Sequence, residues 1–153
     1  MLSAPEQIQT TPTPTAVIRL KVPRSEIRTV MGPAFGELMA TLGAQGIAPA
    51  GPFFTHHFRM DPEFFDCEAG IVVSRPVQPA GRVLPSELPG RTVIRAVYSG
   101  DYEGLGEAWG ELKTRVAEQS LPTAEDLWEC YTTGPESSPN PADWRTELNQ
   151  PLA

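Results

Sequence analysis

The stretch that decides the fold is a repeated one. PAFGELMATLGAQGIAPAGPFFTHHF (Pro33–Phe58) aligns without a gap with EAWGELKTRVAEQSLPTAEDLWECYT (Glu107–Thr132). Near the start of both copies, the run Gly36-Glu37-Leu38 falls on Gly110-Glu111-Leu112. Internal similarity of this kind marks two copies of one structural unit. The sequence therefore predicts a chain built from two related halves.

Each copy carries the pattern of a helix followed by a strand. Apolar residues recur every three or four positions, which indicates one buried helix face, at Met31, Phe35, Leu38 and Leu42 and again at Leu105, Trp109, Leu112 and Val116. β-branched segments before the helices predict one strand in each copy, at Val17–Arg19 and Val93–Arg95. The runs after the helices predict a second strand in each copy, at Phe53–Phe58 and Leu127–Thr132. A further strand at about 69–73 and 145–149 makes each half strand–helix–strand–strand.

These elements predict an α+β fold with a duplicated β-α-β-β unit and pseudo-twofold symmetry. We expect antiparallel sheet, two long helices and a ligand cleft between the halves, since ligand sites favour such seams. The domain should span 15–152, with halves at about 15–75 and 83–152, behind a polar, proline-rich and flexible tail at 1–14. Pro33 leaves the start of the first helix open, because it suits either a first turn or a kink in a helix that begins near Ser25.

The composition of the chain limits the classes of function that we expect. The 153 residues suit a single domain, and 19 acidic against 12 basic residues give a net charge of −7. This charge disfavours a nucleic-acid surface and mildly favours cationic ligands. Neither a signal peptide nor a transmembrane segment is visible, so we expect a cytoplasmic protein that binds no membrane. Cys67 and Cys130 are predicted to be reduced thiols.

Glu129 is the residue that most suggests a site. Strand periodicity places Leu127, Glu129 and Tyr131 on one face, and their equivalents in the first copy are Phe53, Thr55 and His57. A carboxylate in a run suited to burial needs a partner or a proton. With aromatic neighbours it also suits a lipophilic cation, to which each ring adds about 0.5–2 kcal/mol. The alternative is a solvent-facing glutamate on an ordinary alternating strand.

Other candidate residues carry weaker signals. Trp109 lies on the apolar helix stripe, where it serves either the core or a ligand. His56 and His57 are adjacent, so on a strand they point to opposite faces and do not share a metal. We therefore expect no metal and no cofactor.

The residues around the second helix resemble the GyrI-like family, also described as the effector-binding domain of AraC- and MerR-type regulators. The run Val93–Trp109 is similar to that family's strand, Gly-x-Tyr turn and helix. Glu129 and Tyr131 fall on its E-x-Y strand, and its closing W-x-T-E-[LI]-x-x-P strand falls on Trp144, Thr146, Glu147, Leu148 and Pro151. The resemblance covers about Pro14 to Leu152. It implies a duplicated fold with a strand glutamate at the bottom of a pocket for cationic, aromatic drugs.

The resemblance leaves three functions open. The favoured one is binding of a lipophilic, cationic or aromatic small molecule, because a binder needs only shape and one carboxylate. The second is hydrolysis of cyclopropanoid DNA-alkylating toxins, in which Glu129 activates water and Tyr131 or a nearby aromatic polarises the electron-accepting group. The third is a protein-partner module such as a gyrase inhibitor.

With no segment before Pro14 that suits DNA binding, we expect a stand-alone member of this family. A monomer is the simpler expectation, although the residues leave the oligomeric state open. The predicted ligand-binding residues are Phe35, Phe53, Thr55, His57, Trp109, Leu127, Glu129 and Tyr131.

Overall fold

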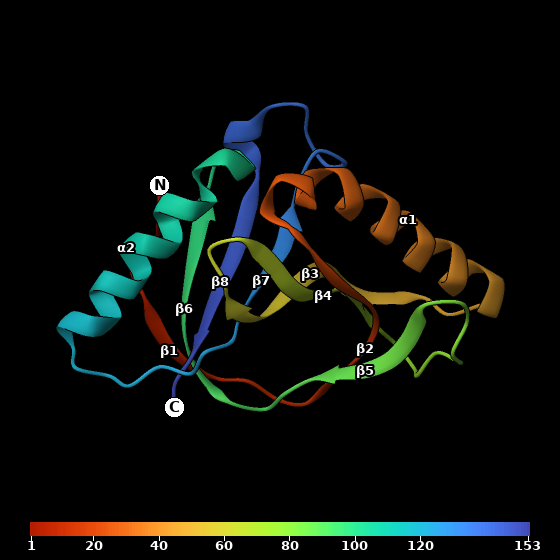
Figure 1. Ribbon diagram of the computed structural model, residues 1–153, viewed down its shortest axis with the longest axis horizontal. Helices are drawn as coiled ribbons and strands as arrows, with labels where there is room; N and C mark the ends of the chain where they lie inside the picture. The colour runs from red at the N-terminus through yellow and green to blue at the C-terminus, as the bar shows by residue number, and fades with distance from the viewer. The chain divides into compact units, whose positions relative to one another are not determined.

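The computed structural model describes residues 1–153, apart from the side chain of Met60. The chain divides into two compact units, of which unit 1 comprises Met1–Thr10 and Arg91–Ala153 and unit 2 comprises Thr11–Gly90. Each unit consists of an antiparallel sheet and one long helix (Figure 1). The predicted α+β class with a duplicated β-α-β-β unit is confirmed. None of the described helices is long and apolar enough to cross a membrane.

Unit 2 contains the first copy of the repeat. Its sheet has the order β3-β4-β2-β5. In chain order its elements are β2 (Thr13–Pro23), the short helix η1 (Arg24–Glu26), α1 (Ile27–Gln45), β3 (Pro49–Met60), β4 (Phe64–Val73) and β5 (Val83–Leu88). Gly46 ends α1 in the left-handed conformation, with φ 64°, which glycine adopts without strain.

Pro33 lies inside α1 rather than in its first turn. The helix starts at Ile27, two residues after the Ser25 start considered from the sequence. An interior proline removes one backbone hydrogen bond and costs a helix about 3 kcal/mol. Helix α1 tolerates it because Ala34, Leu38 and Leu42 on its inner face are buried in the core.

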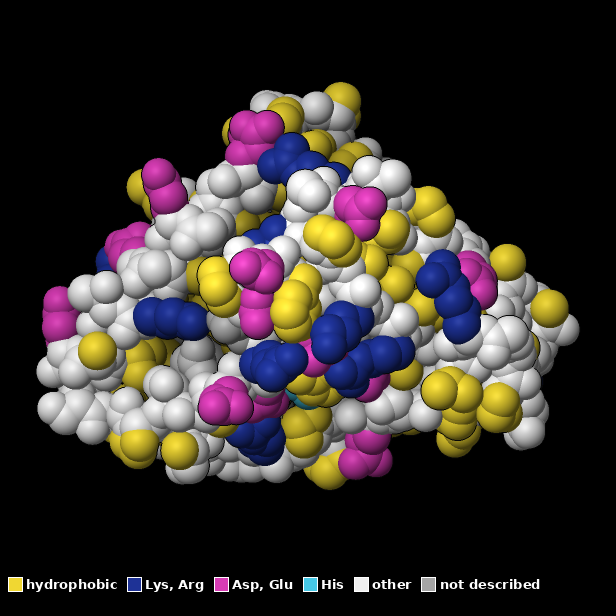
Figure 2. Space-filling model, viewed as in Figure 1, with side chains coloured by type: hydrophobic (Ala, Val, Ile, Leu, Met, Phe, Trp, Pro, Cys, Tyr) yellow, Lys and Arg dark blue, Asp and Glu magenta, His cyan; other side chains and the backbone are white. Residues whose placement is uncertain are grey.

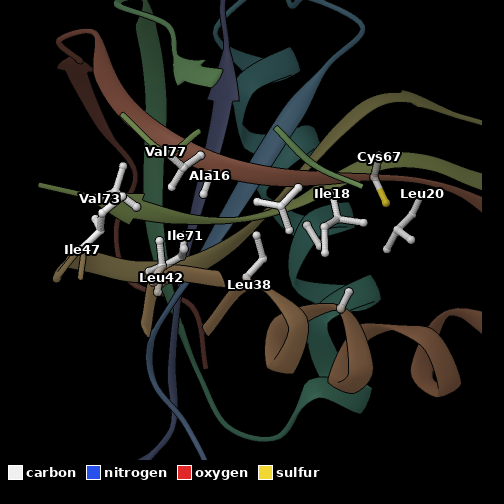
Figure 3. Close-up of a cluster of buried hydrophobic side chains, with 13 residues drawn as sticks. Ala16, Ile18, Leu20, Leu38, Leu42, Ile47, Cys67, Ile71, Val73 and Val77 are labelled. Atoms are coloured by element: carbon white, nitrogen blue, oxygen red, sulfur yellow. The ribbon is translucent and has the colours of Figure 1, made fainter. Parts of the chain in front are cut away.

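The core of unit 2 lies between α1 and one face of its sheet. The inner face of the helix meets alternate residues of β2 and β4, among them Ile18, Leu20 and Ile71 (Figure 3). Alternation along a strand sends every second side chain to the same face, and Ala16, Ile18 and Leu20 all have at most 4% exposure. Full burial of one such aliphatic side chain contributes about 1.5–3 kcal/mol. Phe53 of β3 packs against the same cluster, so α1 covers the face of β3 that bears Phe53.

The other face of the unit 2 sheet is charged. Asp66 lies in ion pairs with Arg19 and with Arg59, the latter at 3.6 Å, and the Arg19 guanidinium also lies 4.3 Å from the centre of the Phe58 ring. Burial raises the pKa of the neighbouring Glu68, and Arg19 partly opposes this rise. Figure 2 shows Lys and Arg side chains mixed with acidic and hydrophobic ones on the face in view.

Unit 1 repeats this arrangement, with sheet order β1-β6-β8-β7. Its elements are β1 (Glu6–Gln9), β6 (Thr92–Ser99), the short helix η2 (Tyr102–Gly104), α2 (Leu105–Glu118), β7 (Leu127–Thr133), the short helix η3 (Pro141–Asp143) and β8 (Arg145–Pro151). Asp101 caps η2 by accepting a hydrogen bond from Gly104 N at 3.3 Å. On one side of the sheet, Ala108, Leu112 and Val116 of α2 pack with residues of β6 and β8. The repeated sheet order confirms the duplication.

The structure corrects the expectation of a flexible tail at 1–14. Residues of β1 pair with β6, from Glu6 opposite Arg95 to Gln9 opposite Thr92, and β2 already begins at Thr13. The pairing runs through backbone groups, so polar side chains do not prevent it. At the other boundary, β5 pairs with β2, which assigns 83–90 to the first half. Strands β1 and β5 thus occupy the same outer place in the two sheets.

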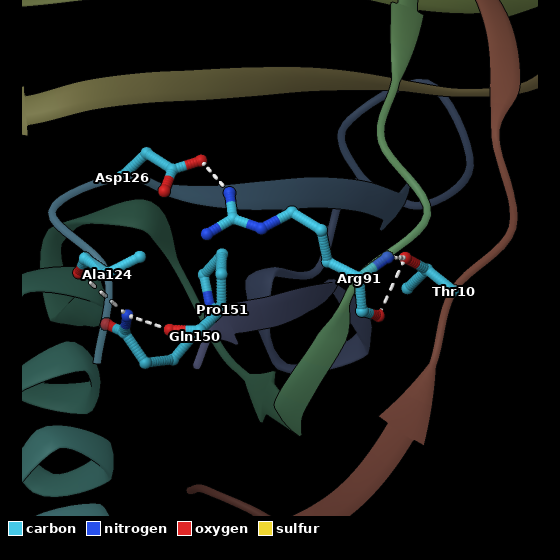
Figure 4. Close-up of polar contacts among 6 residues, drawn as sticks. All are labelled: Thr10, Arg91, Ala124, Asp126, Gln150 and Pro151. Atoms are coloured by element: carbon cyan, nitrogen blue, oxygen red, sulfur yellow. Dashed lines mark hydrogen bonds and ion pairs between the residues drawn. The ribbon is translucent and has the colours of Figure 1, made fainter. Parts of the chain in front are cut away.

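Polar contacts hold the ends of unit 1 together (Figure 4). The Thr10 hydroxyl accepts from the Arg91 backbone N–H at 2.9 Å and donates to the Arg91 carbonyl at 3.1 Å. The Arg91 guanidinium reaches Asp126 at 2.6 Å, and Gln150 donates to the Ala124 carbonyl at 3.4 Å. These contacts tie the end of β1 and the segment before β7 to the same sheet.

Removal of residues 1–9 is therefore expected to destabilise the protein. The deletion breaks the β1–β6 ladder, in which each backbone bond contributes a net of about 0.5–1.5 kcal/mol. The entropy lost on ordering residues 1–9 offsets part of that gain, so we expect a loss of about 1–3 kcal/mol. Denaturant unfolding measures it. The exposed Gln7→Ala substitution, which keeps the backbone ladder, should leave stability within about 0.5 kcal/mol. If the deletion variant unfolds at the same denaturant midpoint as wild type, residues 1–9 add no stability and the expectation of a flexible tail would be correct.

Candidate functional site

Glu129 is buried on the helix-covered face of the unit 1 sheet. Its exposure is 7%, and β7 pairs with β8 so that Glu129 lies opposite Leu148. Directly paired side chains share one face with Cβ atoms about 4.5–5.5 Å apart. Leu148 is fully buried in the cluster that α2 covers. The alternative of a solvent-facing Glu129 is therefore wrong.

Aromatic rings adjoin this strand. The rings of Tyr102 and Tyr131 meet edge to face with centroids 5.6 Å apart, and the Tyr102 ring lies 5.2 Å from that of Trp144. Burial raises the pKa of the Tyr102 hydroxyl, and the carboxylates of Glu136 and Glu129 raise it further. Tyr102 therefore keeps its proton at neutral pH and remains a hydrogen-bond donor near Glu129.

Gly134 makes the position of Tyr102 possible. A Cβ at residue 134 would lie 2.7 Å from the Tyr102 hydroxyl oxygen and 3.0 Å from a carboxylate oxygen of Glu136. Both distances are shorter than ordinary contacts. An alanine at 134 would therefore displace the Tyr102 hydroxyl or the Glu136 carboxylate from its present position.

Leu127 and Trp109 complete the unit 1 candidates. Leu127 is 2% exposed, on the same side of β7 as Glu129. Trp109 is half-buried and packs against the cluster that α2 makes with β6 and β8. The structure thus places all four predicted residues of this unit on or beside the helix-covered face.

The four predicted residues of unit 2 also share one side. Phe53, Thr55 and His57 lie opposite the core residues Ile71, Ala69 and Cys67. This register turns them towards the face that α1 covers. The rings of Phe35 and Phe53 are 4.5 Å apart. In both units the predicted residues therefore occupy the same repeat positions on the same kind of face.

A β-bulge follows the last of these positions in each unit. The β3–β4 register shifts between His57 and Arg59, and the β7–β8 register shifts between Tyr131 and Thr133. The extra residues, Phe58 and Thr132, are repeat equivalents. Bulges are common beside active sites because they re-aim a side chain. This bulge is present at the same position in both copies of the repeat.

The opposite face of the unit 1 sheet has a different character. Arg95 donates to Asn149 at 2.8 Å and lies 3.4 Å from Glu147. Burial raises the pKa of the neighbouring Cys130 thiol to about 12; Glu147 adds to the rise and Arg95 opposes it. Among the described residues, no three His, Cys, Asp or Glu side chains form a group that could hold a metal.

Cys130 is accordingly expected to be inert in the folded protein. At pH 8 a chromogenic aromatic disulfide should label neither buried cysteine of the native chain and both after unfolding, because the thiolate is the reactive form. Stability should also fall as the pH rises from about 8.5, the unperturbed thiol value, because the unfolded thiol ionises while the folded one stays protonated. Fast labelling of the native wild type that is lost in Cys130→Ala would contradict this.

Three residues beside the predicted site were not among the predicted site residues, namely Tyr102, Trp144 and Thr146. Tyr102 follows the Gly100-Asp101 turn, and Trp144 and Thr146 open the closing strand motif, so signals for all three were present. Thr146 lies opposite both Tyr131 and Tyr98 and is fully buried. Their nearness to Tyr131 results from strand pairing and ring contacts between distant parts of the chain.

Comparison with known proteins agrees with the fold. The EcmrR C-terminal domain superposes with a TM-score of 0.88 at 20% identity, over 100% of this chain and 99% of that one. EcmrR in a cryo-EM DNA complex matches with a TM-score of 0.86 at 19% identity, over 97% of this chain and 57% of that one. The present chain thus spans somewhat more than half of that longer protein. SAV2435 bound to tetraphenylphosphonium matches with a TM-score of 0.70 at 10% identity, over 98% of this chain and 94% of that one.

Sequence comparison supplies the family. No curated protein matches the chain. A family model described as the GyrI-like small molecule binding domain matches residues 3–153, which is essentially the whole sequence. The chain therefore belongs to the GyrI-like small molecule binding domain family.

Proposed function

We propose that this protein binds lipophilic, cationic aromatic small molecules and that Glu129 selects for the positive charge. The observation that carries the proposal is the 7% exposure of Glu129 on a helix-covered sheet face, beside Leu148. Water screens a buried carboxylate poorly, so its attraction to a positive charge is stronger than that of an exposed one. The apolar part of a bound organic cation adds buried surface.

The aromatic side chains suit the rest of such a ligand. Tyr102 and Tyr131 are in ring contact, and Tyr102 is close enough to Glu129 for the carboxylate to affect its pKa. Aromatic faces beside a carboxylate attract flat or propeller-shaped aromatic cations through cation–π contact. The unit 2 residues Phe35, Phe53, Thr55 and His57 remain predicted ligand contacts, because each holds the repeat position of a unit 1 candidate.

Among structural neighbours, SAV2435 is described as bound to tetraphenylphosphonium, which makes this cation a suitable first probe. Isothermal titration of the whole chain with tetraphenylphosphonium should give saturable binding. Tetraphenylborate, which has the same shape and the opposite charge, should bind at least about tenfold more weakly, since a buried carboxylate repels an anion. Equal affinities for the two ions, or no binding of the cation, would reject the proposal.

A second candidate is hydrolysis of cyclopropanoid alkylating toxins. It is favoured by Tyr131, which shares a strand face with Glu129, and by Tyr102 in ring contact with Tyr131, because phenol hydroxyls and a carboxylate can serve as acid and base. Glu129 would take a proton from water as the water oxygen bonds to a ring carbon. The ring C–C bond breaks, and its electron pair passes to a conjugated carbonyl that a tyrosine hydroxyl polarises. A structural neighbour from Listeria innocua is described as a hydrolase, with a TM-score of 0.64 at 13% identity over 97% of this chain and 91% of that one.

Mass spectrometry of a cyclopropane-bearing indole toxin after incubation separates the two functions. A water-added, ring-opened product that forms faster with wild type than with Glu129→Gln supports hydrolysis. Binding of the toxin without product leaves only the binding function.

A further inference from the structure

Two donor groups on the helix-covered side of unit 1 are buried without a hydrogen-bond partner among the described residues, namely the indole Nε1–H of Trp109 and the hydroxyl Oγ1–H of Thr146. Thr146 has 0% exposure. Native proteins leave few such atoms unsatisfied, because a buried donor that has lost water and gained no acceptor costs free energy. Each of the two therefore calls for an explanation.

Both residues lie on, or pack against, the sheet face that carries Glu129. Thr146 lies directly opposite Tyr131, and Tyr131 shares its face with Glu129 two residues earlier. Trp109 packs against the α2 cluster that includes Leu148, the residue opposite Glu129. Strand pairing and helix packing thus bring the two donors to the sheet face that carries the carboxylate.

The chemistry of these groups specifies their missing partner. An indole N–H donates and does not accept, and a hydroxyl can also donate. A partner that serves both groups must therefore be an acceptor, because the indole N–H can only donate. Another indole of the same unit has its acceptor within the protein, since Trp144 Nε1 donates to the Ser138 carbonyl at 2.9 Å.

We propose that Trp109 Nε1–H, assisted by the Thr146 hydroxyl, donates to a neutral hydrogen-bond acceptor on the ligand. The preferred ligand class is then a lipophilic aromatic cation that also carries a ketone, amide, ether or ring-nitrogen acceptor, rather than a purely hydrocarbon cation. The inference rests on the proposed binding function and adds a second recognition element to the charge. Sites built to hydrogen-bond a ligand group discriminate strongly against analogues that lack it.

The test compares two matched cations. One is a tetraphenylphosphonium with an acetyl group on one ring, and the other has isopropyl, which contains the same number of heavy atoms and no acceptor. Both are prepared as meta and para isomers and titrated against the whole chain. Wild type should prefer the acetyl compound in at least one isomer by about five- to tenfold, the effect of one net hydrogen bond.

Variants assign this preference to atoms. In Trp109→Phe, and in the nearly isosteric Thr146→Val, the ratio of acetyl to isopropyl affinity should fall towards one, while tetraphenylphosphonium itself still binds. Trp128→Phe is the matched control, because Trp128 lies opposite Asn149 on the face of β7 that does not carry Glu129, and its ratio should stay at the wild-type value. Because the readout is a ratio measured on one protein, a general loss of affinity does not imitate the effect.

Failure of this inference differs from failure of the proposed function. If tetraphenylphosphonium binds wild type but neither acetyl isomer is preferred, the donors do not contact the ligand and the inference is rejected. A preference that persists in both Trp109→Phe and Thr146→Val rejects it as well. If none of the phosphonium cations binds, the proposed function and the inference fall together.

Discussion

Glu129→Gln is expected to weaken tetraphenylphosphonium binding by about 10- to 100-fold, which corresponds to about 1.4–2.7 kcal/mol. The substitution preserves volume and removes only the negative charge. Because Glu129 is 7% exposed, water screens its attraction to a bound cation poorly, and the loss should be larger than for a surface pair. The expected change should appear in calorimetry and in the salt dependence of the affinity.

Glu147→Gln is the matched control for this experiment. Glu147 lies on the neighbouring strand opposite Cys130, so it belongs to the other face of the same sheet, 3.4 Å from Arg95. Its removal changes the net charge by the same amount and should leave the affinity within about twofold, because Glu147 lies on the other face of the sheet and its charge is paired with Arg95. Equal losses in the two variants would mean that overall charge, rather than a charge at the site, attracts the ligand.

Gly70→Ala is expected to destabilise the protein by about 1–3 kcal/mol, the usual cost of overpacking a core. Phe54 lies directly opposite Gly70 in the β3–β4 ladder and is 1% exposed. Its ring covers the glycine so closely that a Cβ at residue 70 would lie 2.3 Å from Phe54 Cζ. Chemical denaturation measures the loss.

A double-mutant cycle shows whether the ring is the cause. Phe54→Leu removes it at a cost of its own, and in that background Gly70→Ala should cost under about 1 kcal/mol because the overlap is gone. Strictly additive effects would mean that the loss of stability does not come from the contact with Phe54.

The duplication was the most informative feature of the sequence because it lies in local patterns. The helix stripes around Leu38 and Leu112 depend only on residues a few positions apart, and the structure buries both leucines fully. Strand alternation likewise assigned Glu129 and Tyr131 to one face before any partner strand was known. The burial of Glu129 on that face required more, namely β8 beside it and α2 across the sheet.

Local patterns also misled at the N-terminus. Residues 1–14 have little to bury, which favours a flexible tail. However, β1 is held by backbone bonds to β6, more than eighty positions away in the sequence. Only the folded sheet, with an open edge at β6, offers those partners.

By itself, the sequence determined the two halves, their strand and helix order and the face that bears the carboxylate, because periodicity and repetition are properties of neighbouring residues. The tertiary structure decided which of these side chains lose water and which neighbours they gain: the rings of Tyr102 and Trp144 near β7, and the donors of Trp109 and Thr146 on the face of Glu129. Hydration and hydrogen-bond satisfaction depend on segments that meet only when the chain folds. For this reason the proposed selectivity depends on contacts that no single stretch of the sequence contains.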